Sequence, residues 1–207
     1  CSSDLSVARK IALFSGVRED AVIMLANAKT VFEVPLTIAA SGINDVLSRF
    51  TGNEKTPDLT KWKDIVTAQM KDHDQTVRVG MVAKYMDNED TYISVLESLK
   101  AAGWQEDTAV EIVWINAETA TDEDFAAVDA LLVPGGFGER GVPGKIAAAT
   151  YALEHKKPYL GLCLGLQVAV IAAARRAGLE GAHSTEFDPN TPNNVVYIME
   201  GQQGKES

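Results

Sequence analysis

Cys163 lies between two glycines, in Gly161-Leu162-Cys163-Leu164-Gly165, where an apolar strand-like run passes into an apolar helical run. This pattern is typical of a nucleophile elbow, a sharp turn that holds its central side chain in a strained backbone conformation with the tip exposed. Flanking glycines let neighbouring elements approach without a Cβ clash. A thiol held in this way could attack a carbonyl carbon, whereas most free cysteines are small core residues.

A second glycine-rich turn follows another apolar strand, in the sequence Leu-Val-Pro-Gly-Gly-Phe-Gly at residues 132–138. Backbone N–H groups of this turn could face the cysteine turn. Two N–H groups aimed at one point form an oxyanion hole, which stabilises the negative charge of a tetrahedral intermediate. Together the two turns indicate acyl transfer through a thioester.

Strands and helices alternate from Thr76 onward, and these elements must position the two turns. We expect strands at 77–83, 110–115, 130–133 and 159–162, and helices at 91–102, 121–125, 145–155 and 164–177. Gly103 is placed to cap the first of these helices. The alternation predicts an α/β fold with a mostly parallel, doubly wound sheet, in which sites lie at the carboxyl ends of strands. Both glycine-rich turns lie at such ends.

The first fifty residues have a different pattern. We expect a strand, a helical turn or second strand, an extended segment and a helix at residues 10–14, 19–25, 31–35 and 37–50. About fifty residues bury too little surface to stand alone comfortably, so we interpret 1–50 as the tail of a domain whose body lies upstream. The polar residues 51–75 indicate an interdomain linker, with a short amphipathic helix around Trp62.

Composition and charge limit the possible functions. The chain has 207 residues, of which 46% are hydrophobic and 23% charged, as in globular domains. Its net charge of −10 argues against a nucleic-acid or membrane-surface partner. Cys1 and Cys163 are the only cysteines, which indicates a reducing, cytoplasmic location rather than a disulfide framework. The sequence shows no membrane-span or signal-peptide pattern.

Three stretches together resemble a known family: residues 132–141, 159–167 and 184–187. They are similar to the class I glutamine amidotransferase domain of the CTP synthases. The Gly-x-Cys-x-Gly elbow alone indicates only the broad class, whereas Gly-Gly-Phe-Gly-x-Arg-Gly and Ser-Thr-Glu-Phe narrow it. Residues 1–50 resemble the end of that family's synthetase (amidoligase) domain. The amidotransferase domain would then span 76–207 and be incomplete at its C-terminus.

The resemblance implies a ligase that makes CTP from UTP, ATP and glutamine, with ammonia released by the amidotransferase domain. Cys163 would be the nucleophile that forms a glutamyl thioester. The backbone N–H groups of Gly136 and Leu164 would hold the oxyanion. Gln167 and Glu186 would bind glutamine, and a carboxylate suits its ammonium group. Outside the motif, Gln167 and Glu186 would be read as ordinary solvated residues.

Nucleotide contacts also follow from the resemblance. Lys10 matches a lysine that contacts UTP or CTP, and Asn27 stands where the family often has an aspartate near the ATP base. Arg140 lies in a lid that responds to the activator GTP. The family further implies Mg²⁺, feedback inhibition by CTP and a homotetramer when full length. The chain has no Walker-type phosphate loop, so ATP and Mg²⁺ should bind mainly upstream, and we assign no metal ligand here.

A thiol nucleophile needs a base, and the family's His-x-Glu pair comes after the Ser-Thr-Glu-Phe stretch, past the point where this chain ends. His73, His155 and His183 are poor substitutes. We therefore expect the chain on its own to lack glutaminase activity. Two alternatives stay open: another class I amidotransferase, such as a GMP synthetase, and a non-catalytic assembly or regulatory module.

Overall fold

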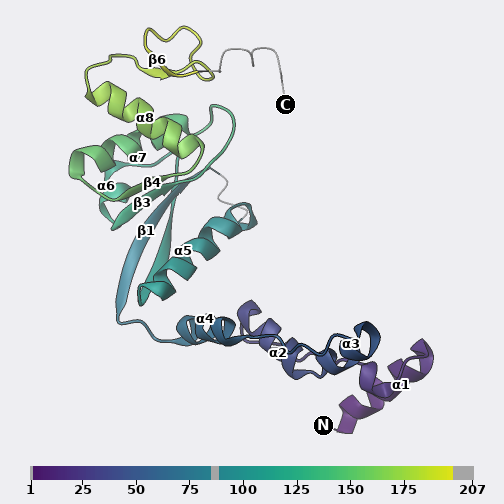
Figure 1. The fold of residues 1–207 in the computed structure, drawn as a ribbon. Coiled ribbons are helices and arrows are strands. Elements are labelled where there is room, and N and C mark those ends of the chain that lie inside the picture. Colours follow the sequence, from purple (N-terminus) through teal and green to yellow (C-terminus); the bar gives the residue numbers. More distant parts are fainter. Residues whose placement is uncertain (1, 85–88, 198–207) are drawn as a thin grey trace. The chain divides into compact units, whose positions relative to one another are not determined.

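The computed structural model describes residues 2–84 and 89–197 (Figure 1). The chain divides into two compact units, Cys1–Asp72 and His73–Ser207, and each is described by itself. The second unit contains both glycine-rich turns.

A four-stranded parallel sheet forms the centre of the second unit (Figure 1). Its strands are β1 (Gln75–Ala83), β2 (Thr108–Asn116), β3 (Ala130–Val133) and β4 (Tyr159–Gly161). They are ordered β2-β1-β3-β4, and every neighbouring pair is parallel. The prediction of a mostly parallel α/β sheet is confirmed, and the predicted strands lie within two residues of the observed bounds.

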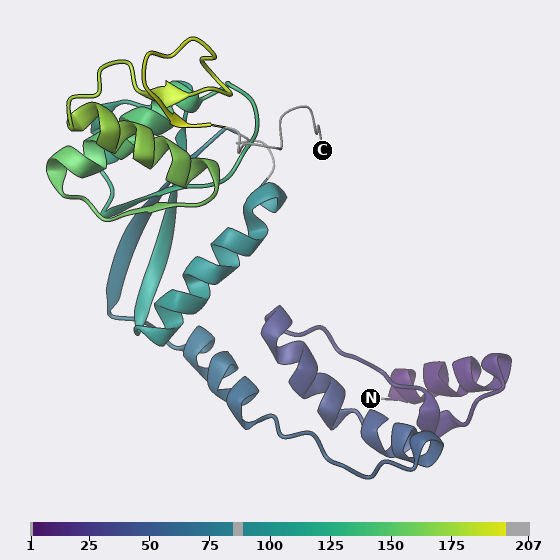
Figure 2. The same cartoon turned by 45° about the horizontal axis from the view of Figure 1, so that its top comes forward.

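Helices cover both faces of this sheet (Figure 2). They are α5 (Ile93–Gln105), which follows the 3₁₀ turn η3 (Glu89–Tyr92), α6 (Asp122–Ala126), α7 (Val142–His155) and α8 (Leu164–Arg176). Alternate strand residues point to opposite faces. Met81 and Leu132 pack with Leu96 of α5, whereas Val82 and Val133 belong to the core cluster that α6, α7 and α8 complete. A short parallel pair, β5 (His183–Ser184) and β6 (Asn194–Val196), follows α8.

Gly103 does not cap a helix, which corrects the prediction. It lies buried inside α5, which ends at Gln105. A Cβ at Gly103 would lie 2.5 Å from the carbonyl oxygen of Thr108, so the glycine is needed for the close approach of β2 to the helix. The residue with positive φ after this helix is Asp107.

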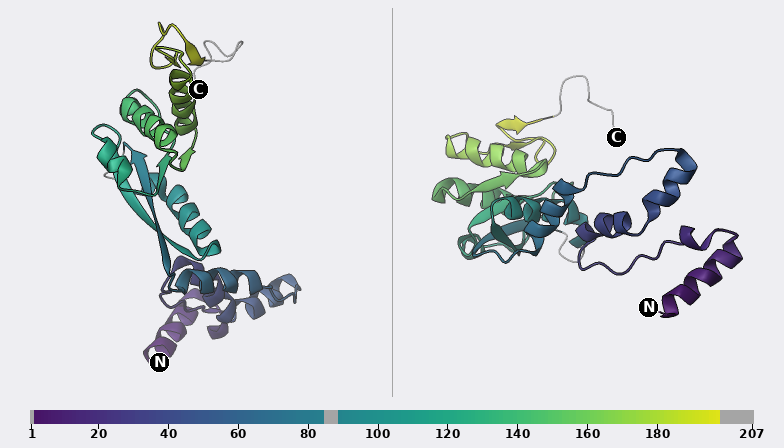
Figure 3. Two further views of the ribbon diagram at one scale, coloured as in Figure 1. Left: turned by 90° about the vertical axis from the view of Figure 1, so that its left-hand side faces the viewer. Right: turned by 60° about the horizontal axis from the view of Figure 1, so that its bottom comes forward.

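The first unit contains helices and no strand among its described residues (Figure 3). Its elements are α1 (Ser2–Ser15), α2 (Val34–Ala40), α3 (Ile43–Thr51) and α4 (Thr60–Met70), with 3₁₀ turns η1 (Glu19–Ala21) and η2 (Val31–Glu33). The predicted strand at 10–14 is wrong, because these residues continue α1. A short apolar run is compatible with either a strand or a buried helical face, and here Ala8 and Ala12, four residues apart, bury one helical face.

The predicted extended segment at 31–35 is also wrong. These residues form η2 and enter α2, because Pro35 stands in the first turn of a helix, where a missing N–H leaves no bond unmade. The helix expected at 37–50 is split in two at Gly42, which has a φ of +83°.

The amphipathic helix predicted around Trp62 is confirmed as α4. Its residues contact η2 and the residue before it. The Trp62 indole N–H donates to the carbonyl oxygen of Phe32, and Thr30 donates its hydroxyl hydrogen to Gln69 Oε1 at 2.7 Å. Within the first unit, α4 is therefore docked on residues 30–32.

Candidate active site at the cysteine turn

Cys163 forms the turn between β4 and α8. Its backbone has φ 53° and ψ −107°, a conformation that residues other than glycine rarely adopt. The cysteine is exposed. The strained, exposed geometry expected of a nucleophile elbow is present. Such strain is stored at functional sites when the surrounding structure enforces it.

Two glycines flanking Cys163 enforce this turn through close backbone contacts. A Cβ at Gly161 would lie 2.4 Å from the carbonyl carbon of Gly165. A Cβ at Gly165 would lie 2.0 Å from the carbonyl oxygen of Val133. Only glycine therefore lets the first turn of α8 lie this close to β3 and β4.

The second glycine-rich turn lies beside the cysteine turn. Val133 pairs with Gly161 across β3 and β4, so both turns leave the sheet at the same level. A Cβ built on Gly135 would lie 3.4 Å from Cys163 Cβ and 3.9 Å from its sulfur. A Cβ on Gly136 would lie 3.8 Å from Leu164 Cδ2. The structure thus places Gly135 beside Cys163, and the next residue, Gly136, beside the Leu164 side chain.

The amino terminus of α8 places backbone donors next to Cys163. The N–H of Gly165 donates to Leu162 O, and those of Leu166 and Gln167 donate to Cys163 O. Leu164 is the first residue of α8, where an N–H has no partner within the helix. The positive end of the helix dipole also favours negative charge at this position. A carbonyl oxygen that gains charge on attack could be stabilised here.

Gln167 and Glu186 take different places. Gln167 is half-buried in the first turn of α8, four residues after Cys163 and therefore on the same side of the helix. Glu186 is exposed in the segment after β5, where its N–H donates to the hydroxyl oxygen of Ser184 at 3.2 Å. The structure brings Gln167 to the cysteine turn and leaves Glu186 on a separate segment.

Lys145 is a site residue that the sequence analysis missed. It lies on α7, its side chain is completely buried, and Nζ donates to Pro134 O at 3.4 Å. Burial lowers its pKa from 10.5 to about 8, Lys84 acts in the same direction, and the charge of Cys163 opposes them. One signal could have found it: Lys145 shares the spacing of the buried Val142 and Ala149, which marks the inner face of the helix.

Arg140 and Lys84 tie the loop after Gly136 to two other strand ends. The Lys84 ammonium donates to Phe137 O, and Arg140 donates to Lys84 O at 3.2 Å. Arg140 also pairs with Glu118, at 2.9 Å between Nε and Oε1. Arg140 is exposed at the same edge of the sheet as the cysteine turn.

The three histidines make their hydrogen bonds with other partners. His73 Nδ1 lies 2.9 Å from Asp107 Oδ1, at the opposite end of the sheet from the cysteine turn. His155 bonds to Tyr151 O at 3.0 Å in the last turn of α7, and His183 accepts from the N–H of Ser184. These bonds give none of them a visible role as the base for Cys163.

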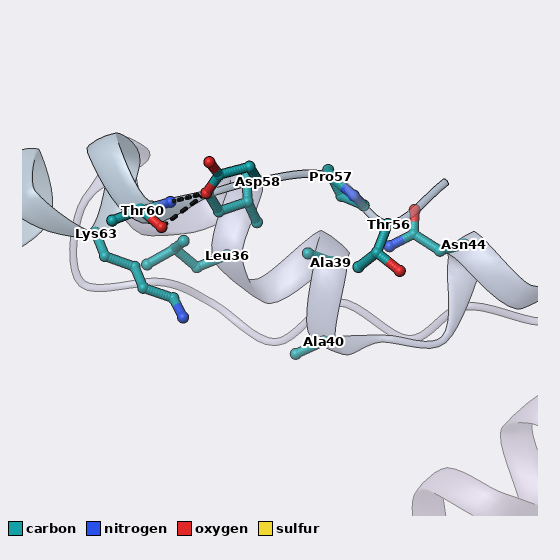
Figure 4. A pocket seen from close by; sticks show the side chains of 10 residues that line it. Leu36, Ala39, Ala40, Asn44, Thr56, Pro57, Asp58, Thr60 and Lys63 are labelled. Atoms are coloured by element: carbon teal, nitrogen blue, oxygen red, sulfur yellow. Dashed lines mark hydrogen bonds between the residues drawn. The ribbon is translucent and has the colours of Figure 1, made fainter. Parts of the chain in front are cut away.

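Lys10 and Asn27 belong to the first unit and are both exposed, Lys10 on α1 and Asn27 between η1 and η2. The same unit has a pocket of about 400 Å³ between α2 and the segment before α4, shown in Figure 4. Asp58 in its wall accepts hydrogen bonds from the N–H and hydroxyl of Thr60, which lower the pKa of this carboxyl. Neither Lys10 nor Asn27 lines this pocket.

Two absences apply to the described part of the chain. Across residues 2–84 and 89–197, no three His, Cys, Asp or Glu side chains gather as ligands for a metal ion. Within the same residues, no helix is long and apolar enough to cross a membrane.

Comparison with known proteins gives consistent matches. The glutamine amidotransferase class-I family model matches residues 88–207. The CTP synthase of Thermomicrobium roseum is 46% identical over 205 residues, covering 97% of this chain and 37% of the relative. That of Bacillus velezensis is 44% identical over 203 residues, covering 95% and 38%. The chain thus spans little more than a third of these relatives.

A solved structure gives the same result. The glutaminase domain of Trypanosoma brucei CTPS with bound acivicin is 36% identical, with a TM-score of 0.58. The match covers 62% of this chain and 52% of that chain.

Proposed function

This chain belongs to the class I glutamine amidotransferase family, and on that premise we propose that Cys163 is the nucleophile that releases ammonia from glutamine. The observation that carries the proposal is the exposed thiol at a strained turn, which lies between the first turn of α8 and the second glycine-rich turn. The names of the relatives support a more specific proposal, in which this ammonia aminates UTP to CTP at the expense of ATP.

The chemistry begins when the sulfur of Cys163 attacks the side-chain amide carbon of glutamine. A C–S bond forms, and the negative charge on oxygen is held by the N–H groups of Gly136 and Leu164. The C–N bond then breaks, and the leaving nitrogen takes a proton to depart as ammonia. Water next attacks the thioester, which releases glutamate and regenerates the thiol. Gln167 and Glu186 would bind the substrate's amide and ammonium groups.

The base that accepts the thiol proton is expected outside the described residues, because the histidines bond elsewhere. The family resemblance points to a His-x-Glu pair. The 207-residue chain by itself is therefore expected to hydrolyse glutamine very slowly or not at all, and a measurable rate that depends on Cys163 would contradict this.

Nucleotide binding forms the remaining part of the proposal. Lys10 and Asn27 would contact nucleotide from the first unit, and Arg140 would respond to GTP because its loop borders the oxyanion turn. The proposal also includes inhibition of the full-length protein by CTP, its assembly as a homotetramer and its location in the cytoplasm. ATP with Mg²⁺ would activate the pyrimidine oxygen, but the described residues do not fit a magnesium site, so no step is assigned to this chain through the metal.

The test uses the protein at the full length of its relatives, with amide-¹⁵N glutamine, UTP, ATP and Mg²⁺. Mass spectrometry should find the label in CTP, and Cys163→Ala should abolish it while ammonia still supports CTP formation. Label released only as ammonia would indicate a different acceptor. No release would favour a non-catalytic module.

In the same assay GTP should stimulate glutamine hydrolysis, and Arg140→Ala should weaken the stimulation without abolishing the basal rate.

A further inference from the structure

We propose that Lys145 is a positioning residue for Cys163. The buried ammonium group of Lys145 stabilises the Cys163 thiolate and holds the turn that presents the Gly136 N–H. The inference rests on the proposed function, since it assumes that the thiolate reacts. No motif marked this residue, and its role follows from its place in the structure.

The geometry sets the ammonium and the thiol on the same short segment of backbone. Lys145 Nζ lies 3.4 Å from Pro134 O and 3.4 Å from where a Cβ of Gly136 would stand. The sulfur of Cys163 lies 3.9 Å from the corresponding point on Gly135. Both Cβ distances are those of ordinary van der Waals contact, so the ammonium and the thiol lie directly beside two consecutive residues of this turn.

The ammonium group of Lys145 has no carboxylate partner among the residues that the structure describes. A buried cation is costly unless it is paired, and lysine is seldom buried without a partner. Among the residues that the structure describes, no carboxylate forms an ion pair with Lys145. The charged groups that face it are Lys84, which has the same sign, and Cys163. The thiolate is therefore the anion that the site can offer.

The carbonyl of Pro134 supplies the second contact. At 3.4 Å it is a long hydrogen bond, so it orients the ammonium without fully satisfying it. The bond runs from α7 to the start of the second glycine-rich turn and fixes the backbone just before Gly136. Lys145 thus places its positive charge beside both the turn and the thiol, and it does so without contacting the substrate.

The test measures the reactivity of Cys163 and requires no glutamine turnover. In a Cys1→Ser background Cys163 is the only cysteine, and iodoacetamide, which is neutral, reports its thiolate. We expect Lys145→Met to lower the alkylation rate about tenfold at pH 7, with the two rates converging by pH 10, well above the pKa of about 8 at which Lys145 loses its charge. Lys145→Gln should behave in the same way.

A matched control is Lys157→Met. Lys157 also donates from its ammonium to backbone carbonyls, including Phe125 O at 2.7 Å, but at the opposite end of α7. Lys157→Met should leave the pH profile of Cys163 alkylation unchanged. Equal profiles for Lys145→Met and the parent chain, or a drop of the same size at every pH, would overturn the proposal.

A second measurement needs no variant of Lys145. In the parent chain the ¹³Cε resonance of Lys145 should titrate near pH 8 and move to lower pH in Cys163→Ala, because the anion that supports its charge is gone. An unchanged titration would contradict the pairing. Failure of labelled glutamine to react would instead remove the proposed function, and the alkylation and titration results would stand apart from it.

Discussion

Lys145 makes the stability of the protein depend on pH in an unusual direction. Burial lowers its pKa to about 8 from 10.5, so between these values the unfolded chain binds more protons than the folded one. The free energy of unfolding therefore rises with pH through this window. At neutral pH the buried charge is a cost, and at higher pH the neutral amine removes it.

Urea unfolding of the parent chain and Lys145→Met should show this. The parent is expected to gain stability relative to the variant between pH 7.5 and 9.5, because methionine has no charge to lose. Burial also raises the pKa of Tyr159, which lowers stability only as the tyrosines of the unfolded chain ionise, near pH 10, so measurements should end below that pH. Parallel pH curves for the two proteins would contradict the prediction.

Residues of the site differ in how well the sequence predicts them. Cys163 could be found because its backbone strain requires a local pattern of glycines that the sequence shows. Lys145 could not be found from residue type, because lysine at the start of a helix is normally solvated. Its burial depends on which face of α7 meets the sheet, and this is a tertiary property.

At the scale of elements, α6 depends on its first turn. Asp124 Oδ2 accepts hydrogen bonds from both the N–H and the hydroxyl of Thr121, each at 2.9 Å. These bonds begin a five-residue helix whose Phe125 is completely buried. The short helix has few other bonds to hold it.

Asp124→Ala is therefore expected to destabilise the protein by about 1 kcal/mol, as lost helix caps do. Asp122→Ala is the matched control, because it removes an acidic residue of the same turn that makes no such bond to Thr121. Urea unfolding monitored by circular dichroism measures both. Equal losses in the two variants would show that helix charge, and not the cap, matters.

The contact between α8 and β3 depends on a single glycine. Gly165→Ala would place a Cβ 2.0 Å from Val133 O, so the helix or the strand must shift. We expect a loss of about 3 kcal/mol or more, at the upper end of overpacked cores. Gly178→Ala, at φ +93° in open space, should cost only about 1–2 kcal/mol from its backbone conformation. Thermal unfolding of both variants tests the difference.

The strands of the four-stranded sheet and the helices between them were predictable because strand runs are bounded by turn residues and alternate with helical spacing, whereas the short pair β5 and β6 was not predicted. The first unit was harder. The apolar residues of α1 and the proline of α2 fit more than one structure, and the correct one depends on neighbours that a local pattern does not specify. Gly103 was misread for a related reason, since a buried glycine and a capping glycine look alike in sequence.

At the scale of the whole molecule, the parts that shape the cysteine turn all lie in the second unit. Both core clusters of the sheet belong to it, as does the pair formed by His73 and Asp107.

A chain of residues 71–207 is therefore expected to fold and to keep the pH profile of Cys163 alkylation found in the 207-residue chain. The profile and near-ultraviolet circular dichroism provide the measurement. Loss of the aromatic signal, or alkylation as fast as in denaturant, would show that residues 1–70 support the second unit.

The backbone conformation of Cys163 lowers the stability of the folded protein. A cysteine at φ 53° and ψ −107° costs about 1–3 kcal/mol, and glycine would relax that strain. Cys163→Gly should therefore melt at a higher temperature than the parent while losing the only thiol at the turn. Glycine is thus the residue that the fold by itself would favour at this position, and the cysteine adds a thiol at a cost in stability.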